Sequence, residues 1–201
     1  MKVIGITGGV GSGKTKLLGY LQIHYNCRVL LADEAARQLQ EPGGSCHRQI
    51  VKLLGEDILG PDGYLRTQVV AEKIFQDKTL LAAVNAVVHP AVREYILGQI
   101  EEERQRGNVA FFFLEAALLI ECGYDTVVEE MWYVHADREV RRQRLKRGRG
   151  YSDEKTDRIL AAQLSEEAYR AHCGFVIDNS REITYAYGQI DKKMGEYLWE
   201  K

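Results

Sequence analysis

One segment of eight residues restricts the fold of this chain more than any other feature of the sequence. Residues 8–15 are Gly-Gly-Val-Gly-Ser-Gly-Lys-Thr, a full match to the phosphate-loop pattern G-x-x-x-x-G-K followed by Ser or Thr. An apolar run at residues 3–6 comes directly before this loop, and Leu17, Leu18 and Leu21 follow it at helical spacing. A strand, a glycine loop and a helix in this order predict an α/β fold that binds phosphate groups.

The chemistry of phosphate binding explains the residue types in this loop. Glycines allow the backbone to curl so that successive N–H groups point inward, and the amino end of the helix adds partial positive charge. Lys14 is then expected to reach the β- and γ-phosphates, and the Thr15 hydroxyl to bind the Mg²⁺ that accompanies them. The loop therefore predicts a bound nucleoside triphosphate, but GTPases, motor ATPases and small-molecule kinases all share it.

Further apolar runs predict the rest of a sheet. They are nearly continuous rather than alternating, which is typical of strands covered on both faces. The four runs after the first occupy residues 29–31, 109–114, 131–134 and 175–177, and stretches with helical spacing separate them. Alternating strands and helices favour parallel pairing. We therefore expect a three-layer α/β fold of the P-loop NTPase type, with a five-stranded parallel sheet, helices on both faces, a helical substrate insertion and a lid.

The length of the chain favours a single domain, because 201 residues lie close to the usual size of about 100–200 residues. We expect one P-loop domain over residues 1–201, with its core at residues 1–40, 106–136 and 165–201. A helical insertion is expected at about residues 55–105 and a lid at about residues 137–164.

Two residues divide the apolar pattern of the expected insertion. His89 and Pro90 lie between two stretches with helical spacing. We therefore expect two helices, with a buried, hydrogen-bonded histidine at their junction and Pro90 in the first turn of the second.

Composition excludes several classes of protein. Lys and Arg total 27 against 29 for Asp and Glu, and a net charge of -2 gives no reason to expect a nucleic-acid or membrane partner. The most apolar stretch, residues 109–120, contains Glu115 and is far shorter than the roughly 20 residues that cross a bilayer. The four cysteines are widely separated and form no C-x-x-C pair, which favours free thiols in the cytoplasm over a zinc site or a disulfide framework.

Three acidic residues are candidates for the site, each with an alternative role. Asp33 follows the second expected strand, where it could accept the proton of an attacking hydroxyl or cap a helix at residues 34–40. Glu115 ends the third strand and could act in the second shell of a metal ion. Glu121 borders the same segment and could instead be a solvated helix residue.

Basic residues gather after the fourth expected strand. Seven of the twelve residues at 138–149 are basic: Arg138, Arg141, Arg142, Arg144, Lys146, Arg147 and Arg149. Such a cluster can form a lid that stabilises the transferring phosphoryl group, or it can be a solvated helix face or a nucleic-acid patch. Ser152, followed by Asp153 and Glu154, is typical of the start of a helix, so we expect the two segments to form a hinged hairpin.

Several motifs occur in the order in which one enzyme family has them. The segment at residues 5–15 is followed by Ala-Asp-Glu-Ala-Ala-Arg at 32–37 and Glu-Pro-Gly at 41–43. The later motifs are Gly-Tyr-Leu-Arg at 63–66, Phe75, Asn85, His89-Pro90, Leu-Leu-Ile-Glu at 118–121, Arg-Leu-Lys-Arg at 144–147, Arg-Ile-Leu-Ala-Ala-Gln at 158–163 and Val-Ile-Asp-Asn at 176–179. This ordered set resembles dephospho-coenzyme A kinase across nearly the whole chain.

The resemblance implies an activity and a set of site residues. The implied reaction is the ATP-dependent phosphorylation of the ribose 3′-hydroxyl of dephospho-CoA, which gives CoA and ADP in the last step of coenzyme A synthesis. Asp33 is then the general base, and Lys14 is also catalytic. The implied ATP-binding residues are Gly11, Ser12, Gly13, Lys14, Thr15, Lys16, Arg144 and Asn179, and the implied substrate-binding residues are Asp33, Arg66, His89, Leu118, Leu119 and Glu121. The implied partners are ATP, with Mg²⁺ bound at Thr15, and dephospho-CoA. The protein itself is expected to be a monomer or a weak homo-oligomer.

The sequence departs from the family pattern at six positions. Leu31 stands where the family usually has the first carboxylate of Asp-Ala-Asp, and residues 115–117 are Glu-Ala-Ala in place of Asp-x-Pro. Tyr169 occupies a usually basic position, Gly174 a position that is usually Asp, and Lys16 one that is often Thr. Two alternatives therefore stay open, a nucleotide-binding regulatory protein without kinase turnover and a P-loop kinase of another small acceptor.

Overall fold

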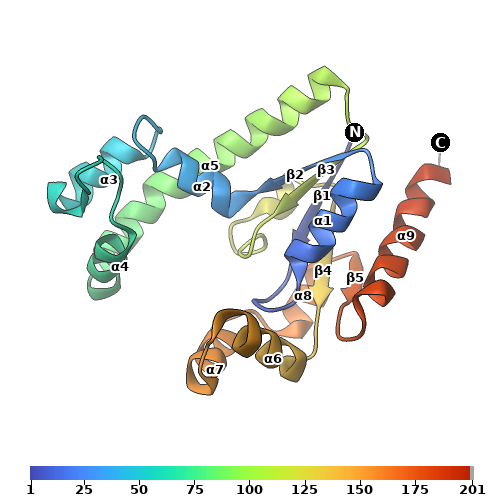
Figure 1. Cartoon of the computed structure of the whole chain (residues 1–201). Coiled ribbons are helices and arrows are strands. Elements are labelled where there is room, and N and C mark those ends of the chain that lie inside the picture. Colours follow the sequence, from blue (N-terminus) through green and yellow to red (C-terminus); the bar gives the residue numbers. More distant parts are fainter. Residues whose placement is uncertain (200–201) are drawn as a thin grey trace. The chain divides into compact units, whose positions relative to one another are not determined.

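The computed structural model describes residues 1–199 and contains the predicted parallel sheet. Its strands are β1 (Lys2–Thr7), β2 (Cys27–Leu31), β3 (Phe111–Glu115), β4 (Glu130–His135) and β5 (Phe175–Asp178), in the order β2-β3-β1-β4-β5 (Figure 1). β1 pairs in parallel with β3 and β4, and β4 pairs in parallel with β5. The five expected strands are confirmed, with ends that differ by one or two residues.

The chain forms two compact units. The first comprises Met1–Val29 and Gly107–Lys201, and the second comprises Leu30–Arg106. The helices of the first unit are α1 (Lys14–His24), α6 (Arg138–Arg149), α7 (Asp153–Ala161), α8 (Glu166–His172) and α9 (Ile183–Trp199), with a short 3-10 helix η2 (Tyr124–Thr126).

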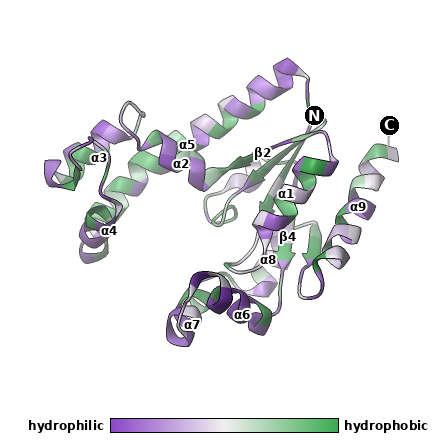
Figure 2. Ribbon diagram, in the orientation of Figure 1, coloured by the Kyte–Doolittle hydropathy of each residue, from purple (hydrophilic) through white to green (hydrophobic). Residues whose placement is uncertain are grey.

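The strands form the core of the first unit because they are apolar on both faces. In β1, Val3, Ile4 and Ile6 have no exposed surface, and in β3 the same is true of Phe112 and Phe113. Figure 2 shows the hydrophobic colouring that runs along these strands. Each such side chain contributes about 1.5–3 kcal/mol when it is fully buried, so the central strands fix the position of the loop that follows β1.

Helix α9 is joined to α1 by a small polar and aromatic cluster. The rings of Tyr20 on α1 and Tyr187 on α9 are stacked with their centroids 3.9 Å apart. The hydroxyls of Tyr20 and Tyr25 donate hydrogen bonds to Asp191 Oδ1 at 2.8 and 2.7 Å. Burial and the bond to Asp191 raise the pKa of Tyr20 to about 12. α9 also buries Ala186, Ile190 and Met194 completely, so it is part of the core.

A second polar cluster surrounds Glu130 at the start of β4. Tyr197 donates a hydrogen bond to Glu130 at 2.5 Å, and the ammonium groups of Lys2 and Lys193 lie 3.3 and 3.5 Å from its carboxylate. Burial raises the pKa of Glu130, but the hydrogen bond from Tyr197 and the two ammonium groups outweigh it and hold the pKa below its usual value.

The second unit is helical and has its own small core. Its elements are α2 (Ala32–Leu39), α3 (His47–Leu54), η1 (Glu56–Ile58), α4 (Thr67–Gln76) and α5 (Lys78–Arg106). Cys46, Ile50, Leu54, Ile58 and Val84 form its buried cluster, with partly buried residues of α4 and α5 packed around it. α5 contacts α2, α3 and α4, so it connects the other helices of this unit.

The prediction of two helices around His89 and Pro90 is wrong. α5 is one continuous helix with Pro90 inside it, and His89 is exposed rather than buried. Pro90 removes one backbone donor and disfavours the helix at its position, but the apolar face continues on both sides and buries Val84, Val92 and Ile96. Tertiary packing along this face therefore outweighs the local preference of proline.

By length and composition alone, α5 is also long and apolar enough to cross a membrane. One such helix is weak evidence for a membrane span, because core helices of globular proteins have the same length and composition.

Candidate active site

The phosphate loop turns between β1 and α1 through backbone angles that favour glycine. Gly8, Gly11 and Gly13 have φ values of 151°, 82° and 94°. A Cβ atom added to Gly8 would lie 2.5 Å from the carbonyl oxygen of Val134, and one added to Gly13 would lie 2.4 Å from Asn179 Nδ2. The positive φ and the lack of space for a Cβ atom therefore both require glycine at residues 8 and 13, where the loop lies next to Val134 of β4 and next to Asn179.

The amino end of α1 is left open for an anion. Gly13 is its N-cap residue and makes no side-chain capping bond, and the first turn contains no acidic residue. The first N–H groups of a helix have no partners within the helix, and the helix dipole places partial positive charge there. This end of α1 can therefore bind a phosphate group, and the exposed side chains of Thr15 and Lys16 lie on its first turn.

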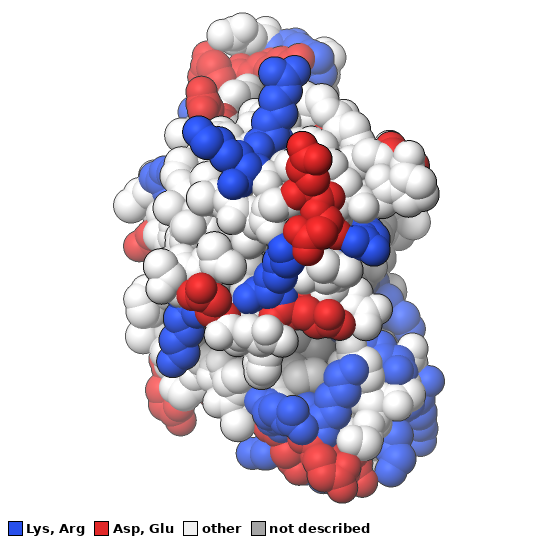
Figure 3. All heavy atoms as spheres, turned by 90° about the vertical axis from the view of Figure 1, so that its left-hand side faces the viewer, with Lys and Arg blue, Asp and Glu red and all other residues white. Residues whose placement is uncertain are grey.

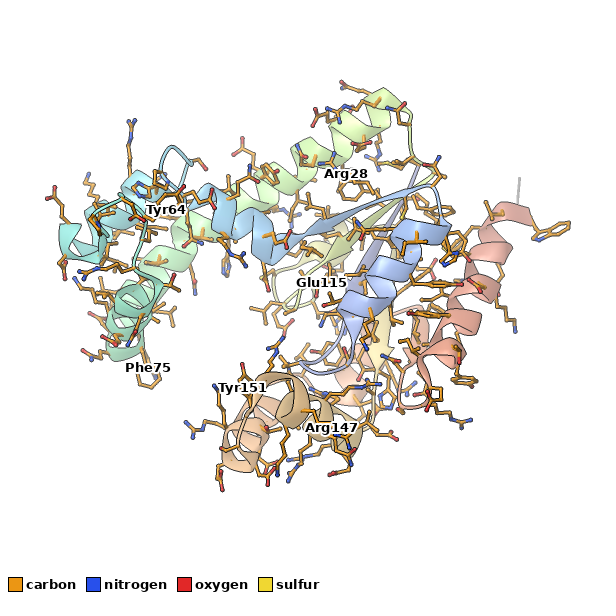
Figure 4. All side chains as sticks on the ribbon, in the orientation of Figure 1. Arg28, Tyr64, Phe75, Glu115, Arg147 and Tyr151 are labelled. Carbon is orange, nitrogen blue, oxygen red and sulfur yellow. The ribbon has the colours of Figure 1, made fainter. Side chains whose placement is uncertain are left out.

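Lys14 is held beside the loop by two oxygen atoms. Its Nζ donates a hydrogen bond of 2.6 Å to the carbonyl oxygen of Gly8 and lies 3.5 Å from Glu115 Oε1. Glu115 is the last residue of β3, where it pairs with Ile6, and Figure 4 shows its position in the sheet. The Lys14 and Glu115 side chains are mostly buried, so a cation and a carboxylate already lie close together at the phosphate loop.

Two residues far apart in the sequence hold the carbonyl oxygen of Ser12. Asn179 Nδ2 donates to it at 2.7 Å and Arg144 Nη1 at 3.2 Å, while Arg144 Nη2 donates to the backbone carbonyl of Asn179 at 2.8 Å. Asn179 is 1% exposed. A cavity of about 480 Å³ lies next to this group, bordered by α6 and residues 180–182. The structure thus brings Arg144 and Asn179 together with the loop.

Arg141 and Gln163 also contact the loop, although the sequence did not identify them as loop ligands. Arg141 Nε donates to the carbonyl oxygen of Val10 at 2.9 Å, and its Nη2 donates to Gln163 Oε1. The same Gln163 oxygen accepts a hydrogen bond of 3.3 Å from the Val10 N–H. Burial lowers the pKa of both Arg141 and Arg144.

The helices after β4 form the predicted hairpin. α6 and α7 pack together, and Ser152 caps α7 by accepting a hydrogen bond of 3.2 Å from Lys155 N. Arg138 and Arg142 of α6 both bind Asp157 of α7. At the lower end of the face in Figure 3, blue basic side chains of this hairpin lie among red acidic ones.

The segment after β3 is a series of turns, so the alternative that Glu121 is a solvated helix residue is confirmed for its exposure and wrong for the helix. Successive turns are closed by the hydrogen bonds from Cys122 N to the oxygen of Leu118 and from Tyr124 N to the oxygen of Leu119. Gly123, with φ of 66°, reverses the chain and prevents a regular helix. Leu118 is 54% exposed and Glu121 is exposed, whereas Leu119 is completely buried and packs against Gly5.

The other predicted substrate residues belong to the second unit. Asp33 is exposed in the first turn of α2, whose N-cap residue is Leu31, so the prediction that Asp33 caps this helix is wrong. The helix begins earlier than expected because Ala32 and Ala35 bury one face of this turn. Arg66 donates a hydrogen bond to the backbone carbonyl of Asp57, and His89 lies exposed on α5.

Comparison with known proteins identifies the family. A model of the dephospho-CoA kinase family matches residues 2–184. The chain belongs to the dephospho-CoA kinase family. The dephospho-CoA kinase of Geobacter sulfurreducens is 37% identical over 180 residues, which cover 90% of each chain.

Solved structures agree with this membership in the dephospho-CoA kinase family. A Thermus thermophilus protein has a TM-score of 0.80 and 30% identity, with 97% of each chain covered. A dephospho-CoA kinase from Campylobacter jejuni has a TM-score of 0.73 and 19% identity, with 98% of each chain covered, and supports the fold alone.

The oxygen atoms at the loop of this dephospho-CoA kinase family member fit a Mg²⁺ ion that arrives with a nucleotide. In the range 1–199, no group of three or more His, Cys, Asp or Glu side chains could hold a metal ion by itself. Mg²⁺ commonly binds through one or two protein oxygens together with substrate phosphates and water. The exposed Thr15 hydroxyl can supply one such oxygen, and the Glu115 carboxylate lies 3.5 Å from Lys14 Nζ.

Proposed function

We propose that the chain is a dephospho-CoA kinase, which transfers the γ-phosphoryl group of ATP to the ribose 3′-hydroxyl of dephospho-CoA. The observation that carries this proposal is the complete phosphate loop, with Lys14 beside it and an uncapped helix end, in a chain that matches the family over residues 2–184. Phosphoryl transfer depends mainly on positioning and charge stabilisation, and this loop offers both.

Binding of ATP would use Gly11, Ser12, Gly13, Lys14, Thr15 and Lys16 for the phosphates. Lys14 would exchange its bond to the Gly8 carbonyl for phosphate oxygens, which are stronger acceptors because they are charged. Asn179 and Arg144 support the loop from the side of the neighbouring cavity, where we place the nucleotide base. Mg²⁺ held by Thr15 would neutralise charge shared by the β- and γ-phosphates.

The acceptor would be bound by the substrate residues that the family resemblance implies. Asp33, exposed and without a capping bond, is available to take the proton of the 3′-hydroxyl as general base. Arg66, His89, Leu118, Leu119 and Glu121 would border the acceptor. Because Leu119 is buried, its contribution is to support the exposed Leu118 and the turns around it.

We further propose that the P-loop core at residues 1–40, 106–136 and 165–201 binds ATP, and that the insertion at about 55–105 holds dephospho-CoA. The hairpin within the lid at about 137–164 would cover the phosphates. The four cysteines are free thiols, which agrees with a cytoplasmic enzyme. We also propose that the protein is a monomer or a weak homo-oligomer, without membrane or nucleic-acid partners.

One assay tests the proposed activity. Purified full chain is mixed with ATP, Mg²⁺ and dephospho-CoA, ADP release is followed by a coupled assay, and the product is identified as CoA by mass spectrometry. Lys14→Ala serves as the inactive control, because the loop remains but the phosphate ligand is lost. ATP binding without acceptor-dependent ADP release would favour the regulatory alternative, to which Leu31 and the Glu-Ala-Ala segment point. Faster ADP release with a nucleoside monophosphate would favour another acceptor.

A further inference from the structure

Five of the seven basic residues of α6 fall into two groups according to their partners. On the side that faces α7, Arg138 lies 3.0 Å from Asp157, Arg142 binds the same carboxylate, and Lys146 lies 3.5 Å from Asp153. Each of these cations has a carboxylate partner on α7, so its position needs no further ligand to explain it.

Arg141 and Arg144 lie on another face of α6, three residues apart, and have different partners. Each donates to carbonyl oxygens at the phosphate loop, Arg141 to Val10 and Arg144 to Ser12. Within residues 1–199, neither guanidinium group has a carboxylate at ion-pair distance. A partly buried cation that is paired only with neutral groups is costly, and an anion at the loop would remove that cost.

Gly9 shows how closely Arg141 approaches the loop. A Cβ atom added to Gly9 would lie 2.2 Å from Arg141 Nη2 and 2.7 Å from Gln163 Oε1. The guanidinium group therefore occupies the space that a side chain at residue 9 would need. Because Gly9 has no side chain, a cation can lie directly on the backbone of the loop.

The environment of Arg141 holds it in this place. Gln163 joins it to the Val10 N–H, so both backbone groups of Val10 are occupied by side chains that follow β4. Behind it, the buried rings of Tyr133 and Tyr169 are stacked with centroids 4.7 Å apart and an interplanar angle of 5°. Both rings lie near Arg141, and burial raises the pKa of both tyrosines, so their hydroxyls stay uncharged. The side chain is thus preorganised rather than free in solvent.

We propose that Arg141 is a phosphate-binding residue of the nucleotide site, held ready on Val10 and Gln163 until a triphosphate replaces the Val10 carbonyl as its acceptor. This inference rests on the proposed function and deepens it, since it adds a second α6 arginine beside Arg144 to the nucleotide site. Gln163, Tyr133 and Tyr169 are positioning residues that act through Arg141.

The test compares two neighbouring arginines of α6 in the full chain. ATP affinity is measured by titration calorimetry for the wild type, Arg141→Gln, Arg141→Lys and the matched control Arg142→Gln, whose side chain binds Asp157 instead of the loop. We expect Arg141→Gln to weaken ATP binding by about 10- to 100-fold, as for loss of a hydrogen bond to a charged group. Arg141→Lys should recover part of this loss because it restores the charge, and Arg142→Gln should leave the affinity unchanged.

A double-mutant cycle separates this role from a structural one. Gly9→Ala displaces the Arg141 guanidinium without removing its charge, so Gly9→Ala and Arg141→Gln should be clearly non-additive in ATP affinity. In kinetic assays, the KM for ATP should rise more than the KM for dephospho-CoA. Melting temperatures of all variants, measured without nucleotide, show how much of each change comes from the fold.

Two results would overturn the inference. The first is an ATP affinity of folded Arg141→Gln equal to that of Arg142→Gln. The second, which does not depend on the folding of any variant, is a crystal structure with a non-hydrolysable ATP analogue and Mg²⁺ in which Arg141 still donates to Val10 and not to phosphate. If the wild-type chain binds no ATP at all, both the inference and the proposed function fail. Binding that is equal in the wild type and Arg141→Gln overturns the inference alone.

Discussion

Replacement of Asn179 by alanine tests how strongly the residue after β5 supports the phosphate loop. The Asn179 side chain is almost completely buried and donates a 2.7 Å hydrogen bond to the Ser12 carbonyl. Asn179→Ala removes this donor, while the Arg144 bonds to Ser12 and to the Asn179 backbone remain. The Ser12 carbonyl keeps its hydrogen bond from Arg144, so the substitution removes one net hydrogen bond, worth about 0.5–1.5 kcal/mol, and leaves this acceptor paired. For a chain of about this size, each kcal/mol lowers the melting temperature by about 2–4 °C, so we expect a decrease of about 1–6 °C.

The chain offers a matched control for this experiment. Asn26 also donates its Nδ2 to a backbone carbonyl, that of Asn108 at 3.1 Å, but it is exposed. Water can replace this bond, so Asn26→Ala should change the melting temperature much less than Asn179→Ala.

Thermal unfolding followed by circular dichroism, together with ATP titration calorimetry, measures the two effects. Asn179→Ala should lose both stability and ATP affinity, because Ser12 belongs to the loop that holds the phosphates. If Asn179→Ala and Asn26→Ala shift the melting temperature equally, and ATP affinity is unchanged in both, the reasoning that a buried bond supports the loop is refuted.

Three other predictions address catalysis and pH dependence. Asp33→Asn should lower kcat by about 10²–10⁴-fold if Asp33 is a general base, whereas Glu34→Gln, an exposed neighbour in the same turn, should not; equal kcat in both variants would exclude this role. Lys14→Ala should abolish measurable ATP binding in calorimetry when circular dichroism shows the variant to be folded, and retained affinity would contradict its phosphate role. Burial alone would raise the pKa of Glu130, but the hydrogen bond from Tyr197 and the nearby ammonium groups hold this pKa below its usual value of 4.5. The ionised carboxylate therefore stabilises the fold above pH 4.5, and this stabilisation is lost as the pH falls below that value. Glu130→Gln should therefore lower the melting temperature at pH 7, and the difference from the wild type should shrink as the pH falls below 4.5; a constant difference would contradict this.

The sequence predicts the parts of the fold in which local pattern and tertiary packing agree. The phosphate loop is an example, because glycines with positive φ, a buried strand before it and Leu17, Leu18 and Leu21 after it all require the same geometry. The strands were equally clear, since continuous apolar runs are needed wherever both faces of a sheet are covered. The cap of α7 by Ser152 followed from local chemistry alone.

Other features depend on contacts that no local pattern contains. The preference of Pro90 to start a helix is overcome by the buried face of α5, which continues from Val84 to Val92. The sequence placed Arg141 in a basic cluster but did not separate it from Arg142, although only one of them contacts the loop. Their different acceptors become visible only when α6 is seen next to Val10 and Asp157. The spacing of three residues between Arg141 and Arg144 is the one signal that could have indicated a shared face.

The attachment of α1 to α9 has a consequence for any attempt to shorten this chain. The match to the family ends at residue 184, yet the helix beyond it supplies Tyr187 and Asp191 to the far end of the helix that carries the phosphate loop. A fragment that ends at residue 184 would lose the contacts of Tyr187 and Asp191 with α1 and would expose one face of the sheet. The end of the family match is therefore a poor guide to where this domain can be trimmed, and an expression boundary should retain all of α9 (Ile183–Trp199).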